Sequence, residues 1–281
     1  MTLSAYDVSH LTIVPRRHYG RIVGGLLVLA ALAAIIRAFA VGQIEWSYVG
    51  EFLTVPVIMR GIVNTIIMAI LAMMLGIALG VVFAVMRLSA NPVLAATAIG
   101  YVWFFRAVPA LLQLLIWFNL ALVFPTMGIP GLFSARTVDI MTPFVAALLG
   151  LGIQQGAFTA EVVRAGLLSV DRGQYEAAQS IGMPRLTMLR RIVMPQAMRV
   201  IVPPIGNEFI GMVKLTSLAS VIQYTEILHS AQNIYYANSR VIELLIVAAI
   251  WYLAVVTVLS LIQMRIERYF ERGVASGRAG R

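Results

Sequence analysis

Long apolar runs separated by short polar segments set the first limit on how this chain can fold. Of its 281 residues, 60% are hydrophobic and 12% are charged, whereas a soluble domain would carry about twice that charge. A helix of roughly twenty apolar residues is long enough to cross a bilayer. The candidate runs cover residues 22–36, 56–86, 93–124, 141–160, 200–222 and 241–264. We therefore expect an all-α polytopic membrane protein with about six transmembrane helices.

The basic residues lie mainly between alternate apolar runs. Arg residues gather before residue 22, at Arg87, within 161–199 and after residue 264, and the formal net charge is +9. Cytoplasmic segments of membrane proteins carry such an excess of Lys and Arg. The pattern predicts that both termini are cytoplasmic. It does not form one basic patch, so we expect membrane lipid and no nucleic acid around this chain.

The first apolar run allows two interpretations. Basic residues precede it, and Ala38-Phe39-Ala40 resembles the site at which a signal peptide is cleaved. The run is equally suited to a retained transmembrane helix, with Arg37 reaching the far interface. Because Arg37 lies beside the supposed cleavage site, we favour the retained helix. Residues 1–53 would then form a cytoplasmic segment, this helix and an external loop that begins at residue 41.

Few residues are suited to catalysis or to metal binding. Cys is absent, which excludes a disulfide, a thiolate nucleophile and a cysteine metal site. The three histidines, His10, His18 and His229, lack metal-ligand spacing, and no His or carboxylate cluster has catalytic spacing. We expect no metal site, no catalytic residue and no cofactor bound by this chain, and a membrane enzyme is disfavoured.

The segment 161–195 is a long polar and basic run in this apolar chain. Its punctuation predicts two short helices: Asp171 caps the first over 173–181, Gly182 ends it, Pro184 begins the second and Pro195 stops it. With apolar runs on both sides, this segment is expected to form a helix–turn–helix platform outside the bilayer.

Within the platform, Glu176-Ala177-Ala178, then Gly182 after three residues and Ile192-Val193-Met194-Pro195 after nine more, resemble the EAA loop of ABC-importer permeases. In that family the first helix of the loop docks in a groove of the cytoplasmic ATP-hydrolysing subunit and passes its motion to the membrane helices. The family usually has Leu where this chain has Met194. The residues that match the motif, and are therefore implied to couple to the ATPase, are Glu176, Ala177, Ala178, Gly182, Ile192 and Pro195.

Two further stretches resemble the polar amino-acid permeases of the histidine/glutamine/glutamate branch. They are FFRAVPALLQLL, around Arg106, and QAMRVIVPPIGNEFIGMVKLTSLASVI, which begins at Gln196. Leu215 replaces the Asp that is common in the branch. The likeness covers about residues 54–272 and implies a type I ABC-importer permease core of five spans. An extra N-terminal helix precedes this core, the coupling loop lies at about 161–199, and residues 273–281 form a basic tail.

The resemblance implies an importer of several subunits in a bacterial inner membrane. It would contain a second permease, either another copy or a related chain, a dimer of ATP-binding subunits and an extracytoplasmic solute-binding protein. The chain has no G-x-x-x-x-G-K-[ST] phosphate-binding loop. ATP and Mg would therefore be used by the partner subunit, and this chain would be a transport subunit without ATPase activity of its own.

Polar residues within the apolar runs suggest where a substrate passes, because such residues usually face a cavity or a partner. On the fifth run Pro203, Asn207, Gly211 and Lys214 share one helical face, which Ser217 continues. Pro203 and Pro204 would loosen the inner end of that helix as a gate. The candidate path residues are Arg106, Gln113, Asn207, Glu208, Gly211, Lys214 and Ser217.

Structural roles for the same charged residues stay open at this point. Arg106 would cap carbonyl groups that Pro109 leaves without donors, and Lys214 would reach outward or pair with Glu208. Glu208 is suited both to a contact between helices and to binding a substrate ammonium group.

The cargo allows alternatives as well. The leading hypothesis is import of a polar amino acid, and the same machinery would serve an amino-acid derivative such as an opine or cystine. A secondary transporter driven by an ion gradient would need no basic platform and would be expected to show inverted repeats. The sequence shows no internal repeat.

Overall fold

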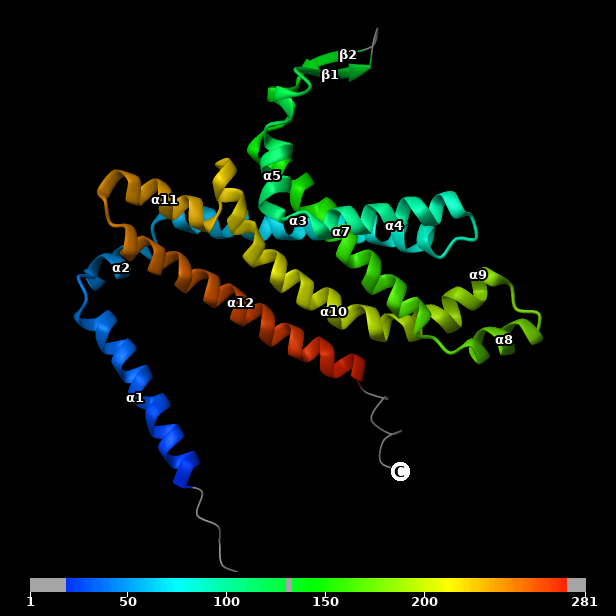
Figure 1. Ribbon diagram of the computed structural model, residues 1–281, viewed down its shortest axis with the longest axis horizontal. Helices are drawn as coiled ribbons and strands as arrows, with labels where there is room; N and C mark the ends of the chain where they lie inside the picture. The colour runs from blue at the N-terminus through cyan, green and yellow to red at the C-terminus, as the bar shows by residue number, and fades with distance from the viewer. Residues whose placement is uncertain (1–18, 130–132, 272–281) are drawn as a thin grey trace, which may run out of the picture. The chain divides into compact units, whose positions relative to one another are not determined.

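A computed structural model describes residues 19–129 and 133–271 of the chain (Figure 1). Two compact units are present, residues 1–46 and 47–281. In the first unit the described element is α1 (Tyr19–Val41), an apolar helix long enough to cross a membrane. The second unit carries the remaining helices, and the platform lies within it.

The predicted class is confirmed by helices of membrane-spanning length. Among the described residues five helices qualify, or six if one bent pair counts as a single span. Apart from the bent pair, the helices of the second unit that qualify are α3 (Pro56–Arg87), α7 (Pro143–Leu168), the helical run Arg185–Ile222 that contains α10 (Met194–Leu215), and α12 (Val241–Glu271). Pro56 and Pro143 lie in the first turn of α3 and α7, where a missing N–H costs nothing.

A close seam between α3 and α7 lies at the centre of the second unit. Gly76 and Gly80 of α3 contact Gln155 and Thr159 of α7, and a Cβ added at either glycine would meet those side chains at 2.6 Å. The two glycines thus let two parallel helices approach closely, as their spacing predicts. The seam continues into a buried cluster that includes Ala84 and Val163.

The third apolar run is a broken helix, where one continuous span was expected. α4 (Pro92–Ala107) and α5 (Ala110–Phe118) meet at an angle of 100°. Pro109 has no N–H to continue the ladder, and its ring holds Val108 in an extended conformation with ψ of 129°. The span predicted over 93–124 thus corresponds to a bent pair of helices, which brings the described spans to six if the pair is counted as one.

Segments between the apolar runs contain regular structure of their own. β1 (Thr126–Ile129) pairs antiparallel with β2 (Phe133–Arg136), followed by the short α6 (Thr137–Ile140). Near the start of the second unit, α2 (Trp46–Phe52) places Val49 in a buried cluster with residues of α3 and α11 (Ile227–Asn238). The hairpin is a small addition to the all-α class.

Candidate functional site

The platform begins with α8 (Arg172–Ser180), which has a defined cap at each end. Asp171 Oδ1 accepts a hydrogen bond of 2.7 Å from the Gly173 N–H. At the other end Gly182 has φ of +70° and donates to Gln179 O at 2.9 Å, while Met183 donates to Ala178 O at 3.1 Å. These two bonds form a Schellman motif, whose left-handed residue is strained for any side chain with a Cβ. The predicted first helix and its Gly182 stop are confirmed.

The second platform helix starts where predicted but does not stop at Pro195. α9 (Arg185–Met188) follows Pro184, passes into the π-helical segment η2 (Leu189–Val193) and continues as α10. The wider turn of a π-helix shifts the preceding carbonyl groups, so Pro195 is accommodated in the first turn of α10. The expectation that Pro195 ends the helix was wrong, and the platform is joined directly to a long membrane helix.

The six motif residues of the platform divide between two sides. Ala178 is buried in the cluster with Met188 and Val193, and Ile192 packs at its edge. Glu176, Ala177, Gly182 and Pro195 are exposed. The remaining exposed surface carries large apolar side chains, of which Ile181 (74% exposed) and Leu186 (76% exposed) are the most exposed. α8 therefore packs against the second platform helix through Ala178 and presents Glu176 and Ala177 outward.

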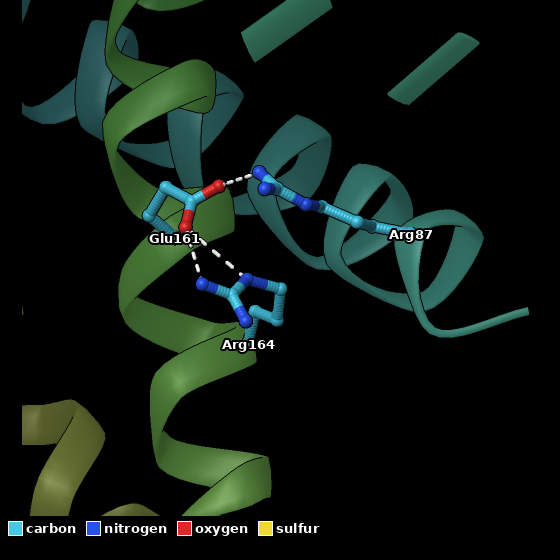
Figure 2. Close-up of polar contacts among 3 residues, drawn as sticks. All are labelled: Arg87, Glu161 and Arg164. Carbon is cyan, nitrogen blue, oxygen red and sulfur yellow. Dashed lines mark hydrogen bonds and ion pairs between the residues drawn. The ribbon is translucent and has the colours of Figure 1, made fainter. Parts of the chain in front are cut away.

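An ion cluster lies ahead of the two short platform helices, near the ends of α3 and α7 (Figure 2), and two of its residues, Glu161 and Arg164, belong to the segment 161–195. Glu161 forms ion pairs with Arg87, the last residue of α3, and with Arg164 on its own helix. Arg164 donates to Glu161 Oε2 through Nη2 at 2.8 Å and through Nε at 3.1 Å. Sequence reasoning missed this cluster, although the i, i+3 spacing of Glu161 and Arg164 indicates its intrahelical half.

A second polar cluster joins α7 to α10 inside the apolar region. Glu208 Oε2 accepts hydrogen bonds from Gln155 Nε2 at 2.7 Å and from Thr159 Oγ1 at 3.1 Å. Gln155 Nε2 also contacts Thr159 Oγ1 at 3.1 Å. The guanidinium of Arg106 lies over the ring of Phe158, 5.2 Å from its centroid. Glu208 is thus a contact between helices, and no ion pair joins it to Lys214, both residues being described.

Backbone carbonyl groups at the Pro109 break accept hydrogen bonds from the side chain of Gln113 and not from Arg106. The Gln113 side chain is buried, and its Nε2 donates to Phe105 O at 3.1 Å and to Val108 O at 2.9 Å. The capping role considered for Arg106 therefore belongs to Gln113. This placement separates Gln113 from the other candidate path residues.

The exposed face of α10 carries the rest of the predicted stripe. Asn207 and Lys214 are exposed, and a Cβ added at Gly211 would have no heavy atom within 4 Å. Ser217, in the 3₁₀ segment η3 (Thr216–Ile222), donates to Lys214 O at 2.8 Å. The inner end of the stripe contacts α12, because Asn207 Nδ2 donates to Glu267 Oε1 at 2.9 Å.

A further polar contact between α10 and α12 was not predicted. Gln263 Nε2 donates to Pro203 O and to Glu267 Oε1, both at 2.9 Å. The backbone passes through Pro203 and Pro204 within one helix, and this contact fixes α12 beside them. Among the described residues, no group of three His, Asp or Glu residues is arranged to hold a metal ion.

Comparison with known proteins places this arrangement in a family. Residues 76–275 match the binding-protein-dependent transport system inner membrane component. The arginine transport system permease protein ArgU of Corynebacterium glutamicum is 37% identical over 92% of this chain and 83% of its own length. The nopaline transport system permease protein NocM of Agrobacterium fabrum is 35% identical over 75% of this chain and 87% of its length.

A solved structure has the same fold. The crystal structure of an amino acid ABC transporter with histidines has a TM-score of 0.67 and 32% identity, covering 76% of this chain and 94% of its own. The family match spans well over half of the sequence and includes the platform, the ion cluster and the polar residues of α10. The chain therefore belongs to the inner membrane components of binding-protein-dependent transport systems, the permeases of ABC importers.

Proposed function

We propose that this chain is the permease subunit of an ATP-driven importer of polar amino acids. It forms the translocation path in a bacterial inner membrane and takes its energy from a separate ATPase subunit. Relatives that transport arginine and nopaline support an amino acid or an amino-acid derivative such as an opine as the cargo. Cystine is a further derivative of that class. Family membership disfavours a transporter driven by an ion gradient.

The exposed side of α8 is the observation that carries this proposal. Glu176 and Ala177 face outward from a helix capped at both ends, beside exposed Ile181 and Leu186. Apolar side chains exposed together at the rim of a basic segment favour burial in a partner protein. We assign this surface to docking with a dimer of ATP-binding subunits, which would use ATP and Mg because this chain has no phosphate-binding loop and acts without ATPase activity.

The assignment of the platform also orients the chain. If α8 docks with a cytoplasmic ATPase, both termini lie on the cytoplasmic side, in agreement with the positions of the Arg residues. The hairpin of β1 and β2 then faces the opposite side, where an extracytoplasmic solute-binding protein would dock. A second permease, either another copy of this chain or a related one, would complete the path.

The open face of α10 is the part of the path that this chain supplies. Asn207, Gly211, Lys214 and Ser217 line it, and the exposed ammonium of Lys214 is available to the cargo. Arg106 of α4 and Glu208 of α10 both contact residues of α7. They would position this face, because Glu208 already accepts hydrogen bonds from Gln155 and Thr159. Lys214→Ala and Asn207→Ala should raise the KM or lower the Vmax of uptake. Unchanged kinetics in both variants would remove α10 from the path.

Purification from a mild detergent tests the docking surface. The ATP-binding subunit should copurify with the wild-type chain, and Glu176→Lys and Gly182→Asp should each lose it. Gly100→Ala is the matched control, because Gly100 lies in α4 with no heavy atom near an added Cβ. If the wild-type chain retains no ATPase subunit and still transports, the proposal is wrong.

A further inference from the structure

The carboxylate of Glu161 joins two helices at the point where the membrane region meets the platform. One of its partners is Arg87, at the end of α3, and the other is Arg164, one turn further along α7. The three side chains converge in Figure 2, with Arg87 approaching from the second helix. Their side chains are 21% to 29% exposed. This partial burial makes an ion pair stronger than one at an open surface.

The position of Glu161 along the α3–α7 seam decides which parts of the molecule its ion pair with Arg87 connects. On the side away from α8, α3 and α7 are held by close packing at Gly76 and Gly80, and beside Glu161 the buried cluster that contains Ala84 and Val163 also includes Ala178 of α8. On the other side of Glu161, α7 ends at Leu168 and α8 begins at Arg172. A displacement of α8 is therefore passed along the chain to α7, and Arg87–Glu161 is the described ion pair that joins α7 to α3.

The far side of the contact leads back into the membrane. Arg87 is followed by a short turn, and α4 then starts at Pro92 with Asn91 as its cap. α4 ends at the 100° break, where its residue Arg106 lies over the ring of Phe158 of α7. A pull on Arg87 is thus delivered to the hairpin of α3 and α4 at its end nearest α8, in addition to the packing of α7 on α3 at Gly76 and Gly80.

We propose that Glu161 is a positioning residue that couples movement of the platform to α3 and α4 through Arg87. This inference rests on the proposed function, since it needs an ATPase that moves the platform. Glu161 touches neither cargo nor nucleotide. It determines whether work done on α8 reaches the α3–α4 hairpin or is absorbed by bending of α7.

The two arginines provide an internal control. Both pair with the same carboxylate, and replacing either with Gln removes one positive charge at the same place. Arg87 links two helices, whereas Arg164 links two turns of one helix. A purely electrostatic or stabilising role would make the two substitutions alike. A coupling role makes them differ.

The experiment compares transport with ATP hydrolysis in proteoliposomes. They contain the permease assembled with its ATP-binding subunit, supplied with its binding protein and a mixture of radiolabelled amino acids. Both rates are normalised to assembled complex, and the quantity compared is cargo imported per ATP hydrolysed. Arg87→Gln and Glu161→Gln should lower that ratio by about fivefold or more, with ATP hydrolysis nearly unchanged. Arg164→Gln should change it by less than about twofold.

A charge exchange completes the test. The double variant Arg87→Glu with Glu161→Arg should recover most of the lost ratio, because the link between helices is restored. If Arg87→Gln fails to assemble, Arg87→Lys is compared with Arg164→Lys in the same way. Equal ratios for the Arg87 and Arg164 variants, or a proportional fall of transport and hydrolysis, would overturn the inference. Absence of ATP-driven uptake in the wild type would overturn the proposed function itself.

Discussion

α7 and α12 differ in a way that hydropathy alone would not predict. An 18-residue stretch of α7 has a mean hydropathy of 1.2, and 61% of that stretch is buried. The corresponding stretch of α12 has a mean hydropathy of 2.6, and only 11% of it is buried. Lipid tails are as apolar as leucine, so a bilayer gives strongly apolar side chains no reason to prefer the protein interior. The interior is instead taken by the helix that carries small and polar residues.

The contacts of each helix show what replaces the hydrophobic effect. α7 meets α3 at Gly76 and Gly80, and it meets α10 through the hydrogen bonds of Glu208. α12 has a mostly exposed apolar surface, and two of its fixed points are polar: Gln263 on Pro203 O and Tyr252 on Glu226. Close backbone approach and buried polar contacts therefore select the interior helix.

Gly80→Leu should have the largest effect, because it enlarges a residue in the α3–α7 seam. A Cβ at this position lies 2.6 Å from Thr159 Cβ, and the loss of stability should be about 3 kcal/mol or more. The unfolding midpoint in detergent measures it. Gly100→Leu is the matched control and should leave the midpoint almost unchanged, since Gly100 has open space. Equal midpoints for the two variants would mean that the seam is not tightly packed.

Truncation of one leucine on each helix compares the two helices directly. Leu151 of α7 is fully buried, and Leu253 of α12 is 69% exposed. Leu151→Ala should cost about 2 to 3 kcal/mol because it leaves a cavity, whereas Leu253→Ala should cost less than about 0.5 kcal/mol. Detergent unfolding curves of the two variants give the difference. A larger loss for Leu253→Ala would reverse the assignment of interior and exterior.

The burial of Glu226, which contacts Tyr252 of α12, makes the stability depend on pH. Glu226 lies at the start of α11, where burial raises the pKa of its carboxyl group to about 6, although Tyr252 and the N–H groups of Leu228 and His229 oppose the shift. A raised pKa means that the fold favours the protonated acid. Its contribution is present below the ordinary pKa and is lost as the pH rises through about 6.

We therefore expect unfolding to become easier by about 2 kcal/mol between about pH 4.5 and pH 7. Thermal unfolding across this range measures the change. Glu226→Gln should flatten the difference and thereby separate Glu226 from the nearby His229. A wild-type slope of the opposite sign, or one that persists in the variant, would assign the pH dependence to another group.

Glu208→Ala is expected to have the smallest effect on stability. It removes the acceptor for Gln155 and Thr159, and hydrogen bonds between membrane helices contribute about 0.6 kcal/mol each on average. A loss of about 1 kcal/mol is therefore expected from unfolding curves. Lys214→Ala, on the exposed face of α10, should leave stability unchanged. If Lys214→Ala destabilises more, its ammonium group contributes to the fold.

Local signals in the sequence were sufficient for the platform. Asp171, Gly182 and Pro184 each act on backbone groups within a few residues, so caps and turns follow from the residues themselves. The i, i+4 spacing of Gly76 and Gly80 is likewise a local signal, and it indicates a close contact between helices. The helix at Pro195 was not, because a π-helical segment upstream accommodates the proline.

The features that escaped prediction depend on side-chain contacts that reach beyond one helical turn. The side-chain amide of Gln113 stabilises the break at Pro109 by donating to backbone carbonyl groups there. These hydrogen bonds favour the break over a simple kink in a continuous helix. Arg87 and Glu161 come together because α3 and α7 are parallel and aligned by their glycines. No local pattern contains that alignment, and the same holds for Asn207 and Glu267.

Site-specific crosslinking tests most directly whether the platform meets an ATPase. Because the chain contains no cysteine, Ile181→Cys introduces a single reactive thiol next to Gly182. Leu122→Cys introduces another thiol far from the platform sequence, at a residue that is 82% exposed. With a short maleimide–benzophenone reagent, which adds to the introduced thiol and on illumination inserts into C–H bonds of a neighbouring chain, the Ile181→Cys chain should crosslink to the ATP-binding subunit, and the Leu122→Cys chain should not. Crosslinking of Leu122→Cys alone, or of neither variant in a complex that hydrolyses ATP and transports, would contradict the coupling role of the platform.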